Sequence, residues 1–341
     1  MTPLRIGLVG CGRIGRNLMR ILGRQSAVDI VAMVDPSAPE ALEYLLKFDT
    51  LLGRFPAPIA LVDGDLEIDG HRIHLLSPDD APPDWAALGV DVVIEASEKL
   101  VSRAACEAHL EQGARRVLLC SPPIEAPDAT IVVGVNDDSL QPEHRIVSAG
   151  SVTANCAAPL IAVLDSAFGI ERVFLTAVHA YSNQLRLADV PADDMRSGRS
   201  APENIIPQQT NADELLTELF PHLVGRISGL AMNVPVANGS VVDLACWLGR
   251  DTTREEINAA VARAAEGPLY GILAYETEPI VSSDILRSSY SGTFDSLSTM
   301  MIGARLSKSL TFYDNGWGYG HRVSDLLRRL GALDDAAGGP A

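Results

Sequence analysis

Three glycines, Gly10, Gly12 and Gly15, form a G-x-G-x-x-G motif that follows an apolar run, Leu4–Val9, and opens a stretch with helical spacing. Such a loop turns a strand tightly into a helix, whose free N–H groups can hold a pyrophosphate. Asp35 ends a second apolar run, 20 residues beyond Gly15, where a carboxylate can accept from both ribose hydroxyls and would repel a 2′-phosphate. The motif therefore predicts dinucleotide binding, with NAD preferred over NADP. The alternative, a glycine-rich turn with a solvated aspartate, is disfavoured by this strand–loop–helix context.

The stretch Ile146–Leu164 could place a nucleophile, because it has the pattern of a strand, a turn and an alanine-rich helix. A thiol on the first turn of that helix would be held as a thiolate by the partial positive charge of the helix N-terminus. The first turn instead carries Ser151, Val152 and Thr153, and Cys156 follows one turn later among apolar residues. We therefore expect Cys156 to be a buried core residue and not an attacking group.

His179 is the candidate acid or base, and it follows a strand predicted over Arg172–Val178. A histidine titrates near neutral pH and can exchange a proton with a substrate, although a lone histidine at a strand end is more often structural. The segment after it, Tyr181–Pro207, is rich in Asp, Arg, Ser and Pro and has little periodicity. A connection of this length is usually functional or lies at an interface.

The elements that must position these residues alternate between strand and helix in the first half of the chain. A helix is predicted over Val101–Gln112, and Asp69-Gly70 predicts a hairpin turn. The predicted strands are Leu4–Val9, Ile30–Val34, Leu61–Ile68, His71–Leu76, Val90–Ile94, Arg116–Leu119 and Thr130–Val133. Together they favour a doubly wound Rossmann domain. From Glu171 the strands become longer, as in Ser240–Leu248, with alanine-rich helices between them.

The length of 341 residues favours two domains. We expect an NAD-binding Rossmann domain over 1–150 and a catalytic and oligomerisation domain over 151–320. A helix over 321–332 is expected to pack back on the first domain. The last residues, from Ala332 onward, are expected to be a frayed tail.

The composition disfavours several classes of function. The chain has 47% hydrophobic and 21% charged residues and a formal net charge of −17, which is typical of an acidic globular protein and disfavours binding to nucleic acid or an anionic membrane. The start of the chain lacks the pattern of a signal peptide, and no apolar run approaches membrane-spanning length, so a cytoplasmic location is expected. Five cysteines without a C-x-x-C pair indicate free thiols, with neither a disulfide framework nor a metal site.

A series of motifs resembles the phosphorylating glyceraldehyde-3-phosphate dehydrogenases over essentially the whole chain. In order these are GLVGCGRIGR at Gly7, VAMVDP at Val31, VGVND at Val133, SVTANCAAPL at Ser151, TAVHAYS at Thr176, ENIIP at Glu203, SVVDL at Ser240, SSYSGTFD at Ser288 and YDNGWGYGHRV at Tyr313. The resemblance implies an α/β fold with an N-terminal Rossmann NAD-binding domain and an α/β catalytic domain whose sheet is mostly antiparallel. It also implies a small-molecule substrate and a homotetramer, in which the Tyr181–Pro207 segment would reach the cofactor of a neighbouring subunit.

The resemblance also implies roles for single residues. It places Val152 where the family has its nucleophilic cysteine, and a valine cannot form a covalent adduct with an aldehyde. His179 matches the family's base, and Asn315 matches the residue that orients the nicotinamide carboxamide. The residues matched to the dinucleotide contacts are Gly10, Gly12, Arg13, Ile14, Gly15, Asp35 and Ser97. Glu98 stands where the family has glycine, and its carboxylate could either repel the pyrophosphate or accept from ribose.

The two anion sites implied by the resemblance are altered unequally. Asn233 replaces the arginine of the substrate-phosphate site, while Ser182 keeps a hydroxyl there, so binding of a phosphorylated triose should weaken. On the inorganic-phosphate side Asn211 replaces a glycine. The residues that stay polar on that side are Ser151, Thr153, Arg199 and Thr210.

Three functions fit these residues. The leading hypothesis is an NAD-dependent oxidoreductase that acts on a noncovalently bound substrate, with His179 as acid or base. The second is a noncatalytic NAD-binding pseudoenzyme or scaffold, because the nucleophile is missing. The third is an active phosphorylating dehydrogenase that uses Cys156, although that thiol should lie about 5 Å too deep along the helix.

Overall fold

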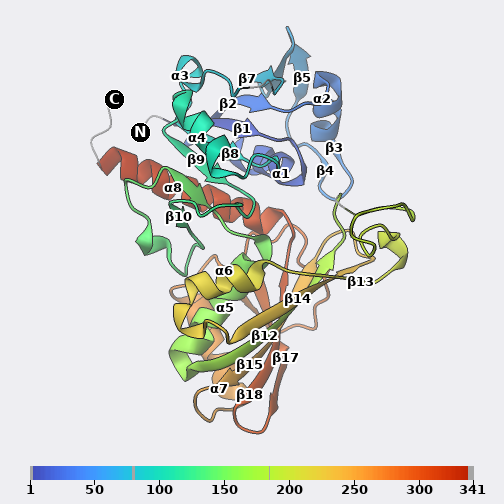
Figure 1. The fold of residues 1–341 in the computed structure, drawn as a ribbon, viewed down its shortest axis with the longest axis vertical. Coiled ribbons are helices and arrows are strands. Elements are labelled where there is room, and N and C mark those ends of the chain that lie inside the picture. Colours follow the sequence, from blue (N-terminus) through green and yellow to red (C-terminus); the bar gives the residue numbers. More distant parts are fainter. Residues whose placement is uncertain (1–2, 79–80, 184, 337–341) are drawn as a thin grey trace. The chain divides into compact units, whose positions relative to one another are not determined.

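The structure is a computed structural model that describes residues 3–78, 81–183 and 185–336 (Figure 1). The chain divides into two compact units. Unit 1 consists of Met1–Ile131, Asp137–Gly150 and Gly320–Ala341, and unit 2 consists of Val132–Asn136 and Ser151–Tyr319. Each unit has its own sheet and its own buried apolar cluster. In the described residues, no helix is both long enough and apolar enough to cross a membrane.

Unit 1 is built on a twisted sheet of nine strands, counted over its described residues. Its centre is parallel: β1 pairs with β2 on one side and with β8 on the other, as expected for a Rossmann sheet. In sheet order the strands are β10 (Ala129–Thr130), β11 (Ile146–Ser148), β9 (Arg116–Leu119), β8 (Val92–Glu95), β1 (Leu4–Val9), β2 (Val28–Val34), β7 (His71–Leu76), β6 (Asp65–Ile68) and β5 (Ile59–Val62). A separate hairpin joins β3 (Phe48–Asp49) to β4 (Gly53–Arg54).

The helices of unit 1 bury their apolar stripes on this sheet. The side chains of Leu18 and Leu22 are fully buried, one turn apart on the first helix. Ser102 caps another helix by accepting from Ala105 N at 3.2 Å. The helices are α1 (Arg13–Leu22), α2 (Pro39–Lys47), α3 (Trp85–Leu88), α4 (Arg103–Glu111) and the part of α8 (Trp317–Ala336) that starts at Gly320.

Two strand predictions in unit 1 are wrong. The predicted strand Leu61–Ile68 is two strands, β5 and β6, because Asp63 (φ +54°) and Gly64 (φ +87°) form a second left-handed turn like the one at Asp69-Gly70. The predicted strand Thr130–Val133 is only Ala129–Thr130 in β10, and Val132–Asn136 belong to unit 2. The Asp69-Gly70 hairpin itself is confirmed, since Ile68 pairs with His71 across it.

Unit 2 contains a seven-stranded sheet, counted over the described residues, that is mostly antiparallel. In sheet order the strands are β13 (Ile206–Gln208), β14 (Ile227–Val234), β12 (Ile170–Ala180), β15 (Ser240–Leu248), β18 (Leu306–Tyr313), β17 (Gly292–Ile302) and β16 (Leu273–Glu276). The pairs β12–β14 and β16–β17 are parallel, and the other pairs are antiparallel. The predicted Tyr181–Pro207 segment is largely irregular, with a short 3-10 helix at Ala201–Glu203 and the start of β13.

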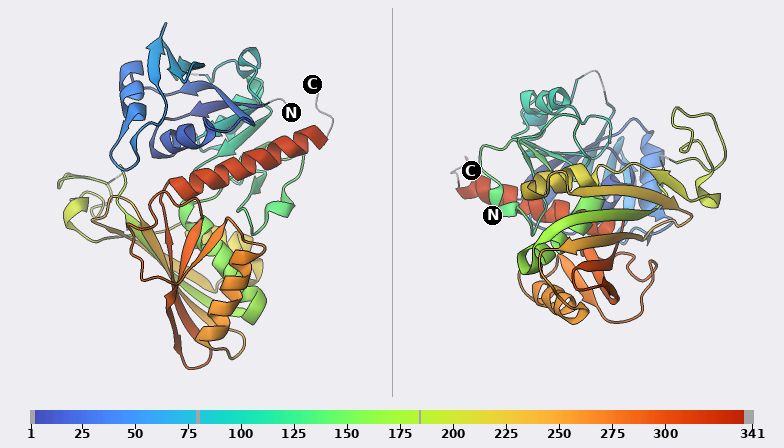
Figure 2. Two further views of the ribbon diagram at one scale, coloured as in Figure 1. Left: turned by 180° about the vertical axis from the view of Figure 1, so that it is seen from behind. Right: turned by 60° about the horizontal axis from the view of Figure 1, so that its bottom comes forward.

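The helices of unit 2 are α5 (Val152–Phe168), α6 (Ala212–Leu219) and α7 (Arg254–Glu266). They pack on one face of the sheet (Figure 2), where their apolar residues join those of the strands in one buried cluster. Alternation along β12 decides which side chains face this cluster: Val173, Leu175 and Ala177 are buried, whereas Phe174 is 68% exposed on the other face. His179 has the same parity as the buried set and therefore faces the helices.

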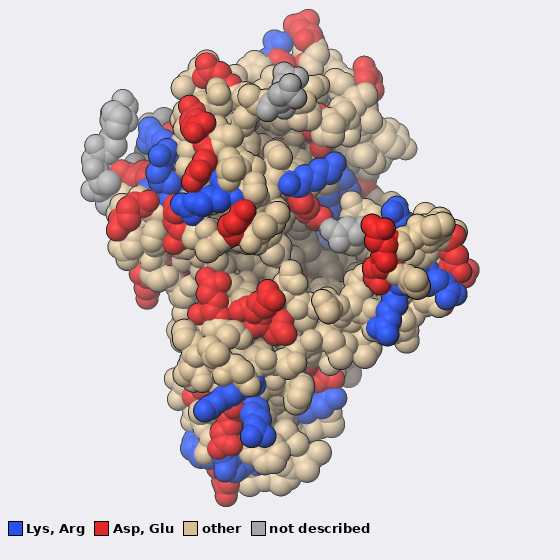
Figure 3. Space-filling view, in the orientation of Figure 1, with Lys and Arg blue, Asp and Glu red and all other residues tan. Residues whose placement is uncertain are grey.

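The C-terminal helix is longer than the predicted range 321–332. It continues through Ala336, so the tail predicted to fray from Ala332 is helical in its described part, and residues 337–341 lie outside the described residues. Within unit 1, Asp334 near the helix end pairs with Arg116 of β9, which holds the last turn against the sheet. On the face drawn in Figure 3, acidic and basic side chains are interspersed, so the acidic excess is not concentrated at one place there.

Candidate functional site

The glycine loop of unit 1 has the geometry of a dinucleotide-binding loop. Gly10 has φ +93°, and a Cβ there would lie 2.6 Å from Ser97 Cα. A Cβ on Gly15 would lie 2.1 Å from Gly10 O, so the helix can approach the loop only without a side chain. At Gly12, by contrast, no atom of the described residues, apart from those of Gly12 and its chain neighbours, lies within 4 Å of the Cβ position. The space at Gly12 is therefore open to a ligand, next to the helix N-terminus, which no side chain caps.

Asp35 lies against this loop, directly after β2. Its Oδ2 accepts from Cys11 N at 2.7 Å, and its Oδ1 accepts from Ser37 N at 2.9 Å. Each carboxylate oxygen keeps lone pairs for a further donor. The structure thus brings Asp35 and the glycine loop together, with Arg13 and Ile14 as the first two residues of α1. This arrangement fits the pyrophosphate and the ribose hydroxyls of NAD.

Ser97 and Glu98 lie on the neighbouring loop, after β8. Ser97 N donates to Glu95 Oε1 at 2.7 Å, and the Ser97 hydroxyl donates to the same oxygen. Burial raises the pKa of Glu95 to about 7. Sequence reasoning missed Glu95, although a carboxylate at the end of a fully apolar strand could have drawn attention to it. Glu98 has φ +62°, the left-handed region that favours glycine, so a glycine at this place would relieve backbone strain.

Two alanine substitutions separate cofactor binding from folding. Gly12→Ala is expected to weaken NAD binding about tenfold, because its methyl group enters the space for the pyrophosphate. Since Gly12 has an ordinary φ of −67° and open space around it, the Tm of the NAD-free protein should shift by less than about 2 °C. Gly15→Ala is the matched control and should destabilise the fold by about 1–3 kcal/mol, because its Cβ clashes with Gly10 O. Calorimetric NAD titration and thermal unfolding distinguish the two, and NAD binding by Gly12→Ala with unchanged affinity would contradict the assignment of the loop.

In unit 2, the N-terminus of α5 carries the residues predicted to flank the chemistry. Ser151 is the N-cap, and its hydroxyl accepts from Ala154 N at 3.1 Å. Val152 is the first helical residue, half-buried, and packs against the core cluster of the unit. Thr153 follows and is 5% exposed. The first turn of α5 therefore offers hydroxyl groups and backbone N–H groups but no thiol.

His179 is held by two hydroxyl groups. Its Nε2 lies 2.9 Å from Thr153 Oγ1, and its Nδ1 lies 3.0 Å from the Tyr313 hydroxyl. A neutral imidazole has one donor and one acceptor nitrogen, which matches two partners that can each donate or accept. Burial lowers the pKa of His179 to about 4, so the ring is neutral at pH 7. Tyr313 was not found from the sequence, because its contact with His179 joins strands β18 and β12, far apart in the chain.

Cys156 lies in the core, as predicted. Its side chain is fully buried, its Sγ is 3.7 Å from Thr311 O, and burial raises the pKa of the thiol. The four other cysteines, Cys11, Cys106, Cys120 and Cys246, are also buried and form no disulfide bond. No cysteine in the described part of the chain therefore has the exposure of a reactive thiol.

The Asn315 side chain is fixed by its neighbours in unit 2. Its Oδ1 accepts from Ser240 Oγ at 2.8 Å, and its backbone N donates to Asn238 Oδ1 at 3.1 Å. Asn238 Nδ2 in turn donates to Asp314 Oδ2 at 2.9 Å. Among the described residues, the Asn315 amide nitrogen Nδ2 has no partner. The amide therefore presents a donor, which is the group that a carboxamide oxygen needs.

The residues predicted to bind anions are spread over several elements of unit 2. Arg199 Nε pairs with Asp189 Oδ2 at 3.0 Å, so its charge is already compensated. Thr210 Oγ1 accepts from Ala212 N at 3.2 Å, at the start of α6, and Asn211 is the N-cap residue of that helix. Ser182 lies two residues beyond β12 and is half-buried. Of the predicted set, the structure brings only Thr153 into contact with His179.

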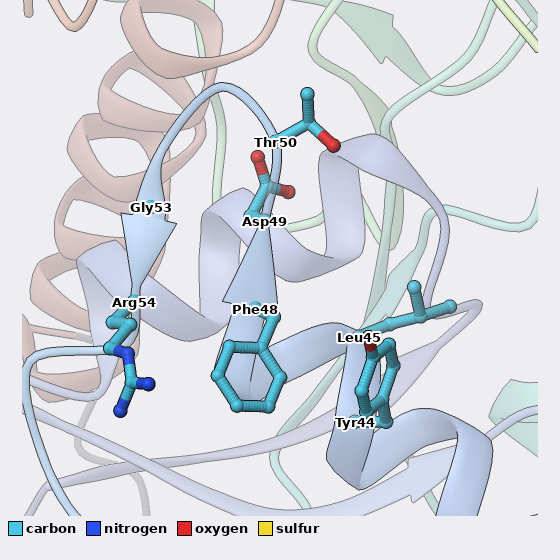
Figure 4. Close-up of a pocket in the computed structure, with 7 residues that line it drawn as sticks. All are labelled: Tyr44, Leu45, Phe48, Asp49, Thr50, Gly53 and Arg54. Atoms are coloured by element: carbon cyan, nitrogen blue, oxygen red, sulfur yellow. The ribbon is translucent and has the colours of Figure 1, made fainter.

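A surface pocket of about 340 Å³ lies in unit 1, apart from every predicted site residue. Figure 4 shows its walls, which come from the end of α2 and from the β3–β4 hairpin. Arg54 lies over the ring of Phe48, with its Cζ 5.1 Å from the ring centroid. This stacking stabilises the hairpin, and the pocket carries no group suited to redox chemistry. Its lining residues are Tyr44, Leu45, Phe48, Asp49, Thr50, Gly53 and Arg54.

Two family models match the chain. Residues 4–103 match the NAD binding domain of glyceraldehyde 3-phosphate dehydrogenase, and residues 151–315 match the C-terminal domain of the same enzyme. The chain belongs to the glyceraldehyde-3-phosphate dehydrogenase family. Its cofactor is accordingly NAD, which the glycine loop and Asp35 of unit 1 fit.

Named members of the glyceraldehyde-3-phosphate dehydrogenase family are similar over nearly their whole length. Glyceraldehyde-3-phosphate dehydrogenase 2 of Streptomyces avermitilis is 43% identical over 333 residues, which cover 96% of this chain and 98% of the relative. The glyceraldehyde-3-phosphate dehydrogenase of Streptomyces coelicolor is 44% identical, covering 96% and 98%. That of Geobacillus stearothermophilus is 42% identical, covering 95% and 97%. The chain is therefore an NAD-binding homologue of these dehydrogenases.

Proposed function

We propose that this chain is an NAD-dependent oxidoreductase that acts on a noncovalently bound substrate, with His179 as acid or base. The observation that supports the proposal is the first turn of α5, which carries Val152 at the position that the motif resemblance assigns to the family's nucleophile, while the nearest cysteine in sequence, Cys156, is fully buried. A thioester route needs a thiolate that an aldehyde can reach. Hydride transfer between an alcohol and a carbonyl compound needs only a correctly positioned nicotinamide, a proton acceptor and polar groups that hold the substrate.

The parts of the proposed site have separate roles. Gly10, Gly12 and Gly15 would hold the pyrophosphate of NAD, and Asp35 would accept from its ribose hydroxyls. Asn315 Nδ2 would donate to the nicotinamide carboxamide, in the orientation that Ser240 imposes. When bound, NAD supplies the acceptor or donor of a hydride. The protein then has to move one proton at the substrate oxygen.

His179 would take or return that proton. Because its ring is neutral at pH 7, Nε2 can accept a proton from an alcohol that is being oxidised. The Thr153 hydroxyl, 2.9 Å from Nε2, both donates and accepts and can pass the proton on. The Tyr313 hydroxyl, 3.0 Å from Nδ1, would hold the ring in place. Arg199, Thr210 and Ser182 would add polar contacts at the edge of this site.

The domain roles and the assembly are part of the same proposal. Residues 1–150, with the helix over 321–332, would form the NAD-binding domain, and residues 151–320 would form the catalytic and oligomerisation domain. A homotetramer is supported by the outer face of the seven-stranded sheet, where Phe174, Trp247 and Ile302 are 68%, 45% and 75% exposed. Burial of these side chains against other copies would remove that apolar surface from water.

A substrate screen tests the proposed function directly. We expect turnover of NADH or NAD with at least one carbonyl or alcohol, and we expect Cys156→Ser to keep kcat within about twofold, because a buried thiol does not take part. NADH absorbance measures both, with thermal unfolding as the control for Cys156→Ser. Absence of turnover with every compound would overturn the proposed function. Loss of turnover in a folded Cys156→Ser variant would instead show that Cys156 takes part in catalysis.

A further inference from the structure

The strand beside His179 carries an asparagine whose orientation is fixed from outside the site. His179 of β12 and Asn233 of β14 are direct partners in the parallel pairing, so their side chains project from the same face of the sheet. Asn233 is 8% exposed. Its Nδ2 donates to Gln208 Oε1 at 2.6 Å, and among the described residues its Oδ1 has no hydrogen-bond partner. An acceptor oxygen that no described residue engages, beside a proposed acid or base, can take a hydrogen bond from a ligand.

The hydrogen bonds that hold Asn233 continue outward through unit 2. Gln208 of β13 donates from Nε2 to Ser197 Oγ at 2.9 Å, and the Ser197 hydroxyl donates to Asp194 Oδ2. These four residues are called the amide relay below. The Ser197 hydrogen bond also lowers the pKa of Asp194, which therefore stays ionised at neutral pH. Asp194, at the outer end of the amide relay, therefore only accepts hydrogen bonds at neutral pH.

The carboxylate sets the direction of every bond in the amide relay. Because an ionised Asp194 can only accept, Ser197 must donate to it, and the Ser197 oxygen then accepts from Gln208 Nε2. Gln208 thus turns its Oε1 toward Asn233, and Asn233 must donate to this oxygen from its Nδ2. The atom left for a ligand is Asn233 Oδ1, an acceptor. Rotating the Asn233 amide to offer its NH₂ group would set two carbonyl oxygens against each other.

An acceptor at this place selects the chemistry of the ligand. A phosphate group at neutral pH offers only acceptor oxygens and negative charge, so it cannot satisfy Asn233 Oδ1 and is repelled by it. The neutral ring of His179 supplies no positive charge to hold a phosphate. The charge of Arg199, which the resemblance matches to an anion site, is compensated by Asp189. A hydroxyl group, in contrast, can donate to Asn233 Oδ1, which no described residue engages.

We infer that the His179 site takes an uncharged, hydroxyl-bearing carbonyl compound or alcohol, held by a hydrogen bond from its hydroxyl to Asn233 Oδ1, and discriminates against phosphorylated substrates. This inference rests on the proposed function in that it names the substrate class of the same site. The discrimination against phosphorylated substrates comes from the direction of the hydrogen bonds in the amide relay. Asp194, which lies on an exposed segment, sets that direction. A distant exposed carboxylate thus controls specificity without touching the substrate.

Binding to the NAD-loaded protein tests the inference without requiring turnover. The probes are D-glyceraldehyde and D-glyceraldehyde 3-phosphate, and their dissociation constants are compared by ligand-observed NMR. We expect the wild type to bind the uncharged probe about tenfold more tightly. In Asp194→Asn the amide that replaces the carboxylate can donate as well as accept, so every hydrogen bond of the amide relay can also run in the opposite direction. Asn233 could then offer its NH₂ group to a ligand, and the preference for the uncharged probe should narrow to about twofold. Asp193→Asn is the matched control, because it removes the same charge one residue away and should keep the preference of the wild type.

Each result of this binding experiment either supports or overturns the inference. Tighter binding of the phosphorylated probe by the wild type would overturn the inference, as would equal effects of Asp193→Asn and Asp194→Asn, which would indicate charge alone. Tighter binding of the uncharged probe, lost only in Asp194→Asn, would support it. If that pattern appears while the substrate screen gives no turnover, the proposed function fails and the specificity of the site stands.

Discussion

Replacement of His179 by glutamine is expected to lower kcat by about 10²–10⁴-fold, the range typical of a lost general acid or base. Glutamine can still hydrogen-bond to Thr153 or Tyr313, but its amide cannot take up a proton. NAD affinity should stay within about twofold, because the glycine loop and Asp35 are untouched. Steady-state kinetics with the best substrate of the screen measures the first effect, and calorimetry measures the second.

The matched variant for His179→Gln is Tyr313→Phe, which keeps the buried ring and removes one hydroxyl from Nδ1. Its kcat should fall by only about tenfold, because His179 loses a positioning contact and keeps its proton chemistry. A His179→Gln variant with the kcat of the wild type would exclude His179 as acid or base. Equal losses in both variants would instead assign the proton transfer to the Tyr313–His179 pair as a unit.

The pH profile gives an independent check on His179. Burial lowers its pKa from an ordinary value of 6.5 to about 4, so the neutral form, which accepts a proton, is present throughout the neutral range. For alcohol oxidation, kcat/KM of the wild type should therefore stay flat through pH 6.5 and fall only as the pH approaches 4. An inflection near pH 6.5 would show a solvated ring and contradict the buried position of His179.

Elements with a clean local pattern could be predicted from the sequence. Leu4–Val9, Arg116–Leu119 and Ser240–Leu248 are strands with the predicted bounds, because continuous or alternating apolar residues mark a buried strand. The glycine spacing predicted the loop, and the distance to Asp35 predicted that the two meet. The apolar neighbours of Cys156 predicted its burial. In each case the information lies within a few residues of the feature.

Features formed between distant segments could not be predicted in this way. Tyr313 meets His179, and Gln208 meets Asn233, only because β18 and β13 take particular places in the sheet of unit 2. No local pattern encodes those places. Arg199 was predicted as an anion ligand from the family resemblance, but whether its charge is available depends on its partner, here Asp189. The direction of the Asn233 amide depends on Asp194, which lies three hydrogen bonds away through Gln208 and Ser197, and no spacing in the sequence reveals this chain of bonds.

Restoring a thiol at the first turn of α5 should have the second large effect. Val152→Cys places a sulfur at the first helical residue, after the Ser151 cap and in the turn that brings Thr153 to His179. The helix N-terminus stabilises a thiolate, and a neutral imidazole does so when it takes up the thiol proton and becomes a cation. If the thiol pKa falls from about 8.5 to about 6, the thiolate fraction at pH 7 rises about 30-fold over that of an ordinary cysteine. Iodoacetamide labelling followed by mass spectrometry measures the rate at this position.

The wild type is the first control for Val152→Cys, because its five cysteines are all buried and should stay unlabelled over the same time. The double variant Val152→Cys, His179→Gln separates the two causes: the helix N-terminus remains while the imidazole is lost, so labelling should slow about tenfold. Rapid labelling of Cys156 in the wild type would overturn the view that the chain lacks an accessible nucleophile. Slow labelling of Val152→Cys, equal to that of an exposed cysteine elsewhere, would show that Val152 does not occupy an activated position. Fast, His179-dependent labelling would mean that the surroundings of a thiolate persist in this chain and that the hydrocarbon of Val152 alone closes the covalent route.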